Sequence, residues 1–331
     1  MAAISSTSSS NTLLKLSIKA ALFILLLVAL DFMIGTSISS AYFELDSGTS
    51  GATINRILNT RSDIFIMGAS TAYHNYKPSI MSRILKKSVY NAGDDGQSIA
   101  HFYGLLRMLS SRHKPKMVIW DISNGDYLWP TTGKSVKDLL PYNKDQSLRS
   151  LLIDADKDNR IALYSKIFPY NGKIANILYS YLMASESVED SLNGYEPLHG
   201  SVDFDNLPRS QNAYQDMIDL DLSFNGQKQV IVTQKYFRKF IEYAQQNNVH
   251  LVCVYSPRAP LTKEYETTLL LNPLLMKELV SLNVPLIQIT ADTDSRLNTL
   301  SSFRDLYHLN DDGANYFSEI VSHQLAEYIN W

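Results

Sequence analysis

Short runs of continuous apolar residues alternate along most of the chain with longer segments in which apolar residues recur at helical spacing. The first pattern is typical of strands buried on both faces, and the second of helices with one buried side. Strands separated by such helices predict a mostly parallel sheet, and we expect an α/β fold, a three-layer α/β/α sandwich. The expected strands span 63–68, 88–93, 116–123, 249–256 and 284–290, and the expected helices span 78–87, 97–112, 227–248, 273–283 and 311–329.

The first 38 residues follow a different pattern. Residues 1–12 are small and mostly polar, and we expect them to be disordered. Residues 13–38 are strongly apolar, with Lys15, Lys19 and Asp31 as their only charges. This segment reaches the roughly 20 residues that a membrane-spanning helix needs, so we expect a transmembrane anchor with Asp31 near its outer interface.

The placement of basic residues predicts the orientation of this anchor. Two lysines lie in its first part, and no Lys or Arg follows it until Arg56. The positive-inside rule then puts the N-terminus in the cytoplasm and the rest of the chain in the periplasm or outside the cell. A signal peptide cleaved after "SISSA", just before Tyr42, is the alternative, and it would yield a secreted protein.

The remaining chain predicts one domain on a stalk. Residues 39–62 are interpreted as the stalk and 63–331 as the domain, with a mainly helical insertion at about 127–226 where the strand–helix alternation is interrupted. Hydrophobic residues make up 45% of the chain and charged residues 19%, which suffices for a large core.

The charge of the chain argues against nucleic acid as a partner, and its cysteine content excludes a disulfide within the chain. The net charge is −3 and no basic patch is evident, so nucleic acid is not an expected partner. Cys253 is the single cysteine, which makes a disulfide within the chain impossible. Its apolar neighbours predict a buried side chain without a chemical role.

The loops that follow the strands carry most of the candidate chemistry. In parallel sheets, sites lie beyond the carboxyl ends of the strands. The first strand ends in "GAS", which places Ser70 at that edge, and "NAGDDGQS", "SNGDY" and "SPRAP" follow three other strands. A serine there is either part of a tight turn or a nucleophile, and a nucleophile needs a base.

His308 is the best candidate for this base. Asp305 precedes it by three residues, which lets the carboxylate reach the imidazole if the segment turns helically. We then expect Ser70 Oγ to lie within hydrogen-bond reach of His308 Nε2. Glu196 and His199 have the same spacing in what resembles a surface turn. A capping or loop-packing role for Asp305 and His308 is the alternative.

Together these blocks resemble the SGNH (GDSL-like) hydrolase superfamily over about 63–126 and 249–331. The first block is "GAS", with Ala69 in place of the family's Asp, and the second is "NAGDDG", which ends at Gly96. The third, "DISNGDY", departs from the family's Gly-x-Asn-Asp, and Asn124 is its only asparagine. The last is the D-x-x-H of Asp305 and His308. The resemblance implies a flavodoxin-like SGNH fold.

The resemblance also implies acyl transfer at an ester. Ser70 would be the nucleophile, His308 the base and Asp305 the residue that orients it. The Ser70 and Gly96 amides, together with Asn124, would form the oxyanion hole. The family requires no metal and no organic cofactor.

A membrane-anchored SGNH domain resembles bacterial envelope proteins that move acyl groups, most often acetyl, onto or off polysaccharides, commonly beside a multi-span membrane acyltransferase. Hydrolysis and transfer both remain open. Aromatic residues around the site, including Tyr76 and Trp129, suit sugar stacking or are ordinary packing. His74 either shapes the pocket or faces solvent. The alternative to an enzyme is a catalytically inactive envelope module that binds glycan or the acyltransferase. The candidate substrate-binding residues are Tyr73, His74, Tyr127 and Arg258.

Overall fold

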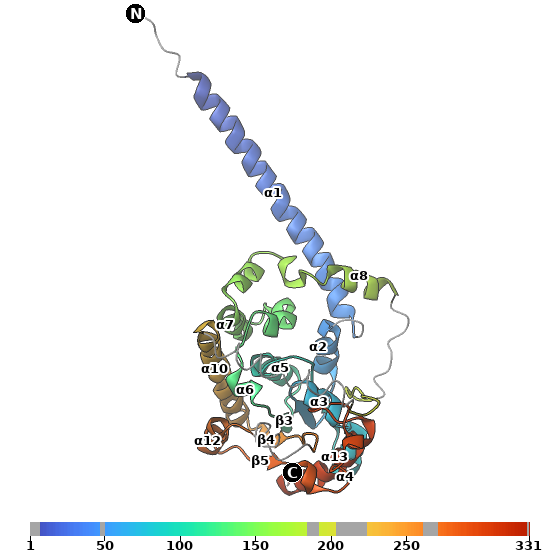
Figure 1. The fold of residues 1–331 in the computed structure, drawn as a ribbon. Helices are drawn as coiled ribbons and strands as arrows, with labels where there is room; N and C mark the ends of the chain where they lie inside the picture. Colours follow the sequence, from blue (N-terminus) through green and yellow to red (C-terminus); the bar gives the residue numbers. More distant parts are fainter. Residues whose placement is uncertain (1–6, 47–49, 184–191, 203–223, 261–270, 330) are drawn as a thin grey trace, which may run out of the picture.

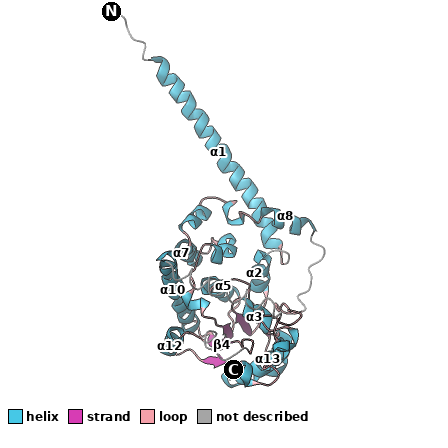
Figure 2. Cartoon of the chain, viewed as in Figure 1, coloured by secondary structure: helices cyan, strands magenta, loops and turns pink. Residues whose placement is uncertain are grey.

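The computed structural model describes residues 7–46, 50–183, 192–202, 224–260, 271–329 and 331. It is a mixed α/β structure in which one long N-terminal helix, α1 (Thr7–Glu44), projects from the domain (Figure 1). Helices make up most of the described chain, and five short strands lie among them (Figure 2).

The five strands form one parallel sheet in the order β2-β1-β3-β4-β5. Ile64 pairs with Val89 on one side and with Met117 on the other, so β1 lies inside the sheet. The predicted parallel sheet is therefore confirmed, with strands two to four residues shorter than the apolar runs that predicted them. The strands are β1 (Ile64–Met67), β2 (Val89–Asn91), β3 (Met117–Asp121), β4 (His250–Tyr255) and β5 (Leu286–Gln288).

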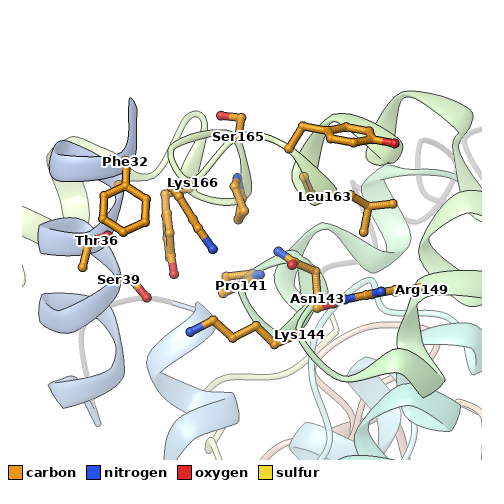
Figure 3. A pocket seen from close by; sticks show the side chains of 15 residues that line it. Phe32, Thr36, Ser39, Pro141, Asn143, Lys144, Arg149, Leu163, Ser165 and Lys166 are labelled. Atoms are coloured by element: carbon orange, nitrogen blue, oxygen red, sulfur yellow. Dashed lines mark hydrogen bonds between the residues drawn. The ribbon is translucent and has the colours of Figure 1, made fainter. Parts of the chain in front are cut away.

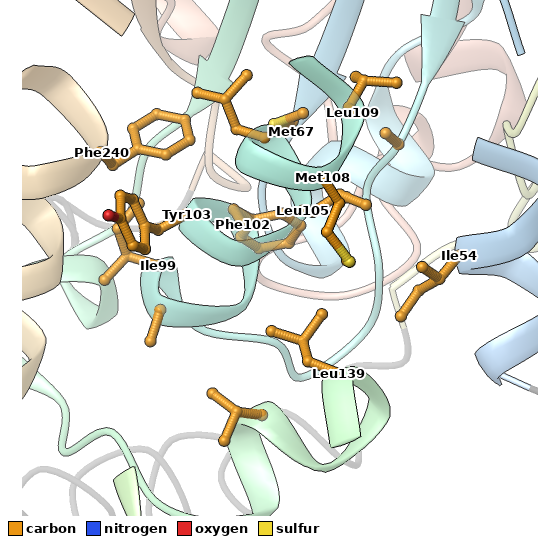
Figure 4. Close-up of a cluster of buried hydrophobic side chains, with 14 of the residues drawn as sticks. Ile54, Met67, Ile99, Phe102, Tyr103, Leu105, Met108, Leu109, Leu139 and Phe240 are labelled. Carbon is orange, nitrogen blue, oxygen red and sulfur yellow. The ribbon is translucent and has the colours of Figure 1, made fainter. Parts of the chain in front are cut away.

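Alternate residues of each strand enter two different apolar clusters, because successive side chains of a strand point to opposite faces. Phe65 and Met67 of β1 belong to one cluster, whereas Ile64 and Ile66 belong to the other. Figure 4 shows part of the first cluster, where Met67 lies near side chains of α5. The first cluster includes residues of α2 (Ser50–Asn59), α5 (Ile99–Arg112), α10 (Phe224–Gln246) and α12 (Pro273–Ser281), and the second includes residues of α3 (Ser70–Asn75), α4 (Pro78–Leu85) and α13 (Asp311–Leu325).

Residues 127–183 of the predicted insertion are mainly helical and share the first core cluster, whereas Tyr195 and Val202 lie outside helices and belong to the second cluster. Gly104 of α5 lets this layer approach closely, since a Cβ there would lie 2.6 Å from Leu139 Cδ1. Residues 184–191 and 203–223 of the insertion lie outside the described residues. The helices of the insertion are α6 (Gly125–Leu128), η1 (Lys134–Tyr142), α7 (Gln146–Ala155), η2 (Lys157–Leu163), η3 (Phe168–Tyr170) and α8 (Ile174–Met183). Three short helices outside the insertion lie nearer the C-terminus, namely η4 (Ala291–Thr293), η5 (Leu300–Ser302) and η6 (Ala326–Tyr328).

Helix α1 is long and apolar enough to cross a membrane over Thr12–Glu44, although a signal sequence meets the same criteria. The N-terminal segment 1–12, predicted to be disordered, falls partly on residues 1–6, which lie outside the described residues; Thr7 to Thr12 belong to α1.

Of residues 39–62, predicted to be a stalk, the structure describes 39–46 and 50–62, and both parts contribute buried residues to the first core cluster. Their first residues continue α1, and most of the rest form α2, whose Ile54 and Ile57 are buried in the first core cluster. Asn55 joins the two helices, because its Nδ2 donates to the carbonyl oxygens of Tyr42 at 2.8 Å and Leu45 at 3.0 Å. The segment packs because its apolar residues recur at helical spacing.

Candidate active site

Ser70 is placed by a turn that only glycine accommodates. Gly68, directly after β1, has φ +147°, and a Cβ there would lie 2.6 Å from the Asp121 carbonyl oxygen and 2.9 Å from Ala72 Cβ. The backbone therefore passes against β3 and enters α3 at once, with Ser70 as the first helical residue. The turn holds the Ser70 side chain at the carboxyl end of the sheet.

Ser70, His308 and Asp305 form one continuous hydrogen-bonded chain. His308 Nε2 lies 2.6 Å from Ser70 Oγ, and His308 Nδ1 lies 2.8 Å from Asp305 Oδ2 and 2.9 Å from Oδ1. Ser70 is 238 residues from His308 in sequence, so this contact is made entirely by the fold. The prediction that Ser70 Oγ lies within hydrogen-bond distance of His308 Nε2 is confirmed.

Asp305 is held by its own turn as well as by the imidazole. Its Oδ1 accepts from the backbone N–H groups of Tyr307 at 2.8 Å and His308 at 2.9 Å. Burial would raise the pKa of Asp305, but the hydrogen bond and charge of His308 and these backbone donors outweigh it and lower that pKa. Asp305 is therefore an ionised acceptor near neutral pH, with a fixed orientation toward Nδ1.

The loop that carries His308 is tied directly to the helix that carries Ser70. Leu309 N–H donates to Asn75 Oδ1 in α3 at 3.0 Å, and Phe303 and Leu309 form an antiparallel bridge that closes the loop. Asn310 then caps α13, since its Oδ1 accepts from Gly313 N–H at 3.0 Å. These bonds fix the two halves of the site relative to each other.

A buried carboxylate, Asp121, lies beneath α3 at the end of β3. It accepts from Thr71 Oγ1 at 2.5 Å, from Tyr76 OH at 2.6 Å and from Ser256 Oγ. Burial raises the pKa of Asp121, and the three hydroxyl donors oppose that shift. The network links the ends of β3 and β4 to the helix of Ser70, so Asp121 is a positioning residue that the sequence analysis did not identify.

Ser70 and His308 open into a cavity of about 190 Å³ at the carboxyl edge of the sheet. One side comes from the loops after β1 and β3, which are neighbouring strands, and the other from β4 and the loop before α13. The lining residues are Ala69, Ser70, Thr71, Ser123, Asn124, Gly125, Trp129, Tyr255, Arg258, Tyr307 and His308.

The two candidate oxyanion donors beyond Ser70 lie in different positions. Asn124 lines the cavity, and its Oδ1 accepts from Asn272 N–H at 2.7 Å, which fixes the orientation of the amide. Gly96 has φ +67° in the loop after β2 and is not among the described residues that line the cavity. The structure thus brings Asn124, but not Gly96, to the cavity of Ser70.

The four candidate substrate-binding residues also separate. Arg258 lines the cavity and donates from Nη1 to the Tyr307 carbonyl oxygen at 3.2 Å. Tyr127 does not line it; the ring is buried and packs edge-to-face on Phe237 at 5.1 Å, whereas Trp129 does line the cavity. Tyr73, half-buried beside His74, is not a lining residue either.

His74 is neither a lining residue nor the solvent-facing residue that was one of its two interpretations. It is buried in α3, with Nδ1 2.8 Å from the Glu196 carbonyl oxygen and Nε2 3.1 Å from Asp95 Oδ1. Its ring lies 5.7 Å from that of His308. Burial lowers the pKa of His74, but the hydrogen bonds to Asp95 and the Glu196 carbonyl oxygen, together with the charges of Asp95 and Glu196, outweigh burial and raise that pKa. Tyr76, one of the aromatic residues expected around the site, is fully buried and does not line the cavity.

Three lining residues had no individual signal in the sequence. Tyr255 ends β4, Ser123 follows β3, and Tyr307 lies inside the D-x-x-H segment. Their shared position just beyond strand ends or beside the histidine is the signal that would have found them. Among the described residues, no group of three or more His, Cys, Asp or Glu side chains is arranged to hold a metal ion.

No protein-family model matches the chain, and no curated protein matches it significantly in sequence. A functional assignment therefore depends on the residues and geometry described above.

Proposed function

We propose that the protein is a serine-dependent acyl-transfer enzyme of the SGNH type, acting on an ester of an envelope or exported polysaccharide. The observation that carries this proposal is the chain from Asp305 through His308 to Ser70, at 2.8 and 2.6 Å, which ends in a cavity. A serine, a base and a carboxylate in this order are the parts that nucleophilic acyl transfer needs.

The sheet supports the finer fold assignment. The strand order 2-1-3-4-5 is that of flavodoxin-like sheets, and ligands in such sheets bind where the order reverses, between β1 and β3. Ser70 follows β1 and Asn124 follows β3, so both lie at this reversal. Apolar clusters on both faces of the sheet support the three-layer α/β/α architecture.

The proposed reaction has two halves. Ser70 Oγ attacks the ester carbonyl while His308 Nε2 takes its proton, and Asp305 stabilises the imidazolium that forms. The tetrahedral intermediate then collapses, the proton passes from Nε2 to the leaving alcohol, and the acyl group remains on Ser70. In the second half, His308 deprotonates water or a sugar hydroxyl, which attacks the acyl group and frees the serine.

The developing oxyanion would be met by the Ser70 backbone N–H and the Asn124 side-chain amide. Because Asn124 Oδ1 is bonded to Asn272 N–H, the Nδ2 end is the one that would serve as donor. Gly96 is not supported in this role by the cavity lining.

The cavity and α1 support the proposed substrate and location. A volume of about 190 Å³ suits a small acyl group such as acetyl, and Trp129 and Tyr307 offer aromatic surfaces to a sugar ring. Helix α1 would hold the domain on the outer side of a membrane, near exported polysaccharide and beside a multi-span acyltransferase.

The proposal is tested by the esterase activity of the full chain in nanodiscs, with a chromogenic acetyl ester and a fluorophosphonate probe that labels activated serines. We expect Ser70→Ala to abolish labelling and to lower kcat/KM at least about 10³-fold. Ser123→Ala is the matched control, since Ser123 lines the same cavity with its hydroxyl bonded to Asp126. Equal turnover by the wild type and Ser70→Ala would instead support a non-catalytic binding module.

A further inference from the structure

Exposed apolar side chains are concentrated on one part of the surface. Outside α1, thirteen large apolar side chains are exposed among the described residues, and eight of them belong to residues 161–183. Tyr164 is 87% exposed, Leu182 77% and Tyr179 68%. These eight side chains are carried by η2, the turn after it and α8, and we call them the apolar collar. The collar comprises Ile161, Leu163, Tyr164, Leu178, Tyr179, Tyr181, Leu182 and Met183. Single exposed apolar residues are ordinary, but such a concentration marks an interaction surface.

Helix α8 shows that the collar is more than loose packing. One side of the helix packs inward through Ile174, which is partly buried, and Ile177, which is fully buried. The other side presents Leu178, Tyr179 and Leu182 outward. A helix that is apolar on both sides belongs in a protein core or in contact with lipid.

The collar lies at the level where the apolar part of α1 ends. Asp31 of α1 accepts hydrogen bonds from Ser165 Oγ at 2.6 Å and from Lys166 N–H at 2.7 Å. Gly35, one turn further, permits this approach, because a Cβ there would lie 2.4 Å from Lys166 Cβ. Residues 16–34 of α1 would span about 28 Å, close to the thickness of a bilayer core. Figure 1 shows α8 beside α1 at the edge from which α1 projects.

A basic pocket of about 320 Å³ lies between α1 and the insertion at this same level. Lys144, Arg149 and Lys166 line it, together with Ser39 and Asn143, and its described lining includes no carboxylate. In Figure 3, Lys144 and Lys166 extend into the space between the two elements. Even with Asp31 near Lys166, the cations outnumber the acidic groups, so the pocket suits a phosphate group.

We propose that the collar and this pocket form a lipid-binding surface on which the domain rests against the outer face of the membrane. The collar side chains insert among the acyl chains at the interface, where Tyr164 and Tyr179 suit the boundary between lipid and water. The pocket holds the phosphate of an anionic lipid headgroup. The inference rests on the proposed placement of α1 in a membrane, but it uses no catalytic residue, so its tests are separate from the test of acyl transfer.

The first test measures the depth of the collar with the full chain in nanodiscs. Cys253 is fully buried, so a cysteine at Leu182→Cys takes an environment-sensitive fluorophore selectively. Val280→Cys on α12 is the matched control, because Val280 is 76% exposed, as Leu182 is 77%. We expect a blue-shifted emission and quenching by spin-labelled lipid at position 182 only. A water-exposed label at 182 in nanodiscs that contain this chain alone would overturn the proposal and point to a protein partner.

The second test measures headgroup preference. The full chain is extracted from nanodiscs of phosphatidylcholine and phosphatidylglycerol, and retained lipids are counted by native mass spectrometry. We expect enrichment of phosphatidylglycerol that falls about tenfold in Lys144→Gln with Arg149→Gln. Arg83→Gln with Lys277→Gln makes the same charge change on exposed residues elsewhere and should leave it unchanged. No enrichment in the wild type, equal loss in both double variants, or displacement by inorganic phosphate alone would refute a lipid headgroup site.

Discussion

Replacing Asp305 by Asn tests the catalytic geometry most sharply, because it changes the chemistry at one contact and almost nothing else. Asp305 presents one oxygen to two backbone N–H groups and both oxygens to His308 Nδ1. An Asn side chain can keep its carbonyl oxygen on the backbone donors, and its NH₂ group then faces Nδ1.

That exchange reverses the imidazole tautomer. Facing an NH₂ donor, Nδ1 of His308 becomes an acceptor, and the proton moves to Nε2, which lies 2.6 Å from Ser70 Oγ. A protonated Nε2 cannot take the serine proton. The expected loss is about 10⁴-fold in kcat, or about 5.5 kcal/mol of transition-state stabilisation, with little change in Tm.

The assay is the steady-state hydrolysis of a chromogenic acetyl ester by the full chain in nanodiscs, with a thermal melt in the same buffer. Asp311→Asn is the control, because Asp311 lies on the same segment but bonds to Lys77 and Tyr195 rather than to the imidazole. A fall in kcat smaller than about tenfold, with the fold intact, would show that Asp305 only caps its turn and would refute the reasoning.

Two further predictions concern stability. Gly68→Ala should destabilise the domain by at least about 2 kcal/mol, because φ is +147° and the new Cβ would clash with the Asp121 carbonyl oxygen. Gly96→Ala has φ +67° and open space around the Cβ, so it should cost about half as much. A denaturant titration of both variants measures the two losses. Comparable losses for the two variants would contradict the steric argument. Burial and the charge of Asp95 raise the pKa of Asp94 to about 6, so the folded state binds a proton more tightly than the unfolded state and loses stability as pH rises from about 4 to 6. Asp94→Asn should therefore raise Tm above about pH 6 and change it little near pH 4; an equal shift at both pH values would exclude titration of Asp94 as the cause.

Much of the fold was predictable because it depends on local patterns. A strand buried on both faces requires a continuous apolar run, and all five runs became parallel strands. The three-residue spacing of Asp305 and His308 also acts locally, since one turn of chain suffices to join them. The length and hydropathy of α1 follow in the same way from composition alone.

The positions of several site residues were not predictable from such patterns. Tyr127 and Trp129 are two aromatic residues in one loop, and nothing in their spacing tells which is buried on Phe237 and which lines the cavity. Gly96 has a left-handed backbone conformation, with φ +67°, but lies outside the cavity lining. In the sequence, Asp121 is only the residue at the end of an apolar run. Its role is visible in the fold, where the hydroxyl groups of Thr71, Tyr76 and Ser256 donate hydrogen bonds to it.

What the sequence by itself determined about this protein is which segments are strands and helices, which of them is apolar enough for a membrane, and which side chains lie at strand ends. What only the tertiary structure decided is how segments distant along the chain meet. Ser70 is hydrogen-bonded to His308, which lies 238 residues away in the sequence. Asp31 accepts a hydrogen bond from Ser165, which lies 134 residues away. Apolar periodicity records whether a residue is buried, but it does not record which distant residue buries it. That choice is made by the packing of the whole core.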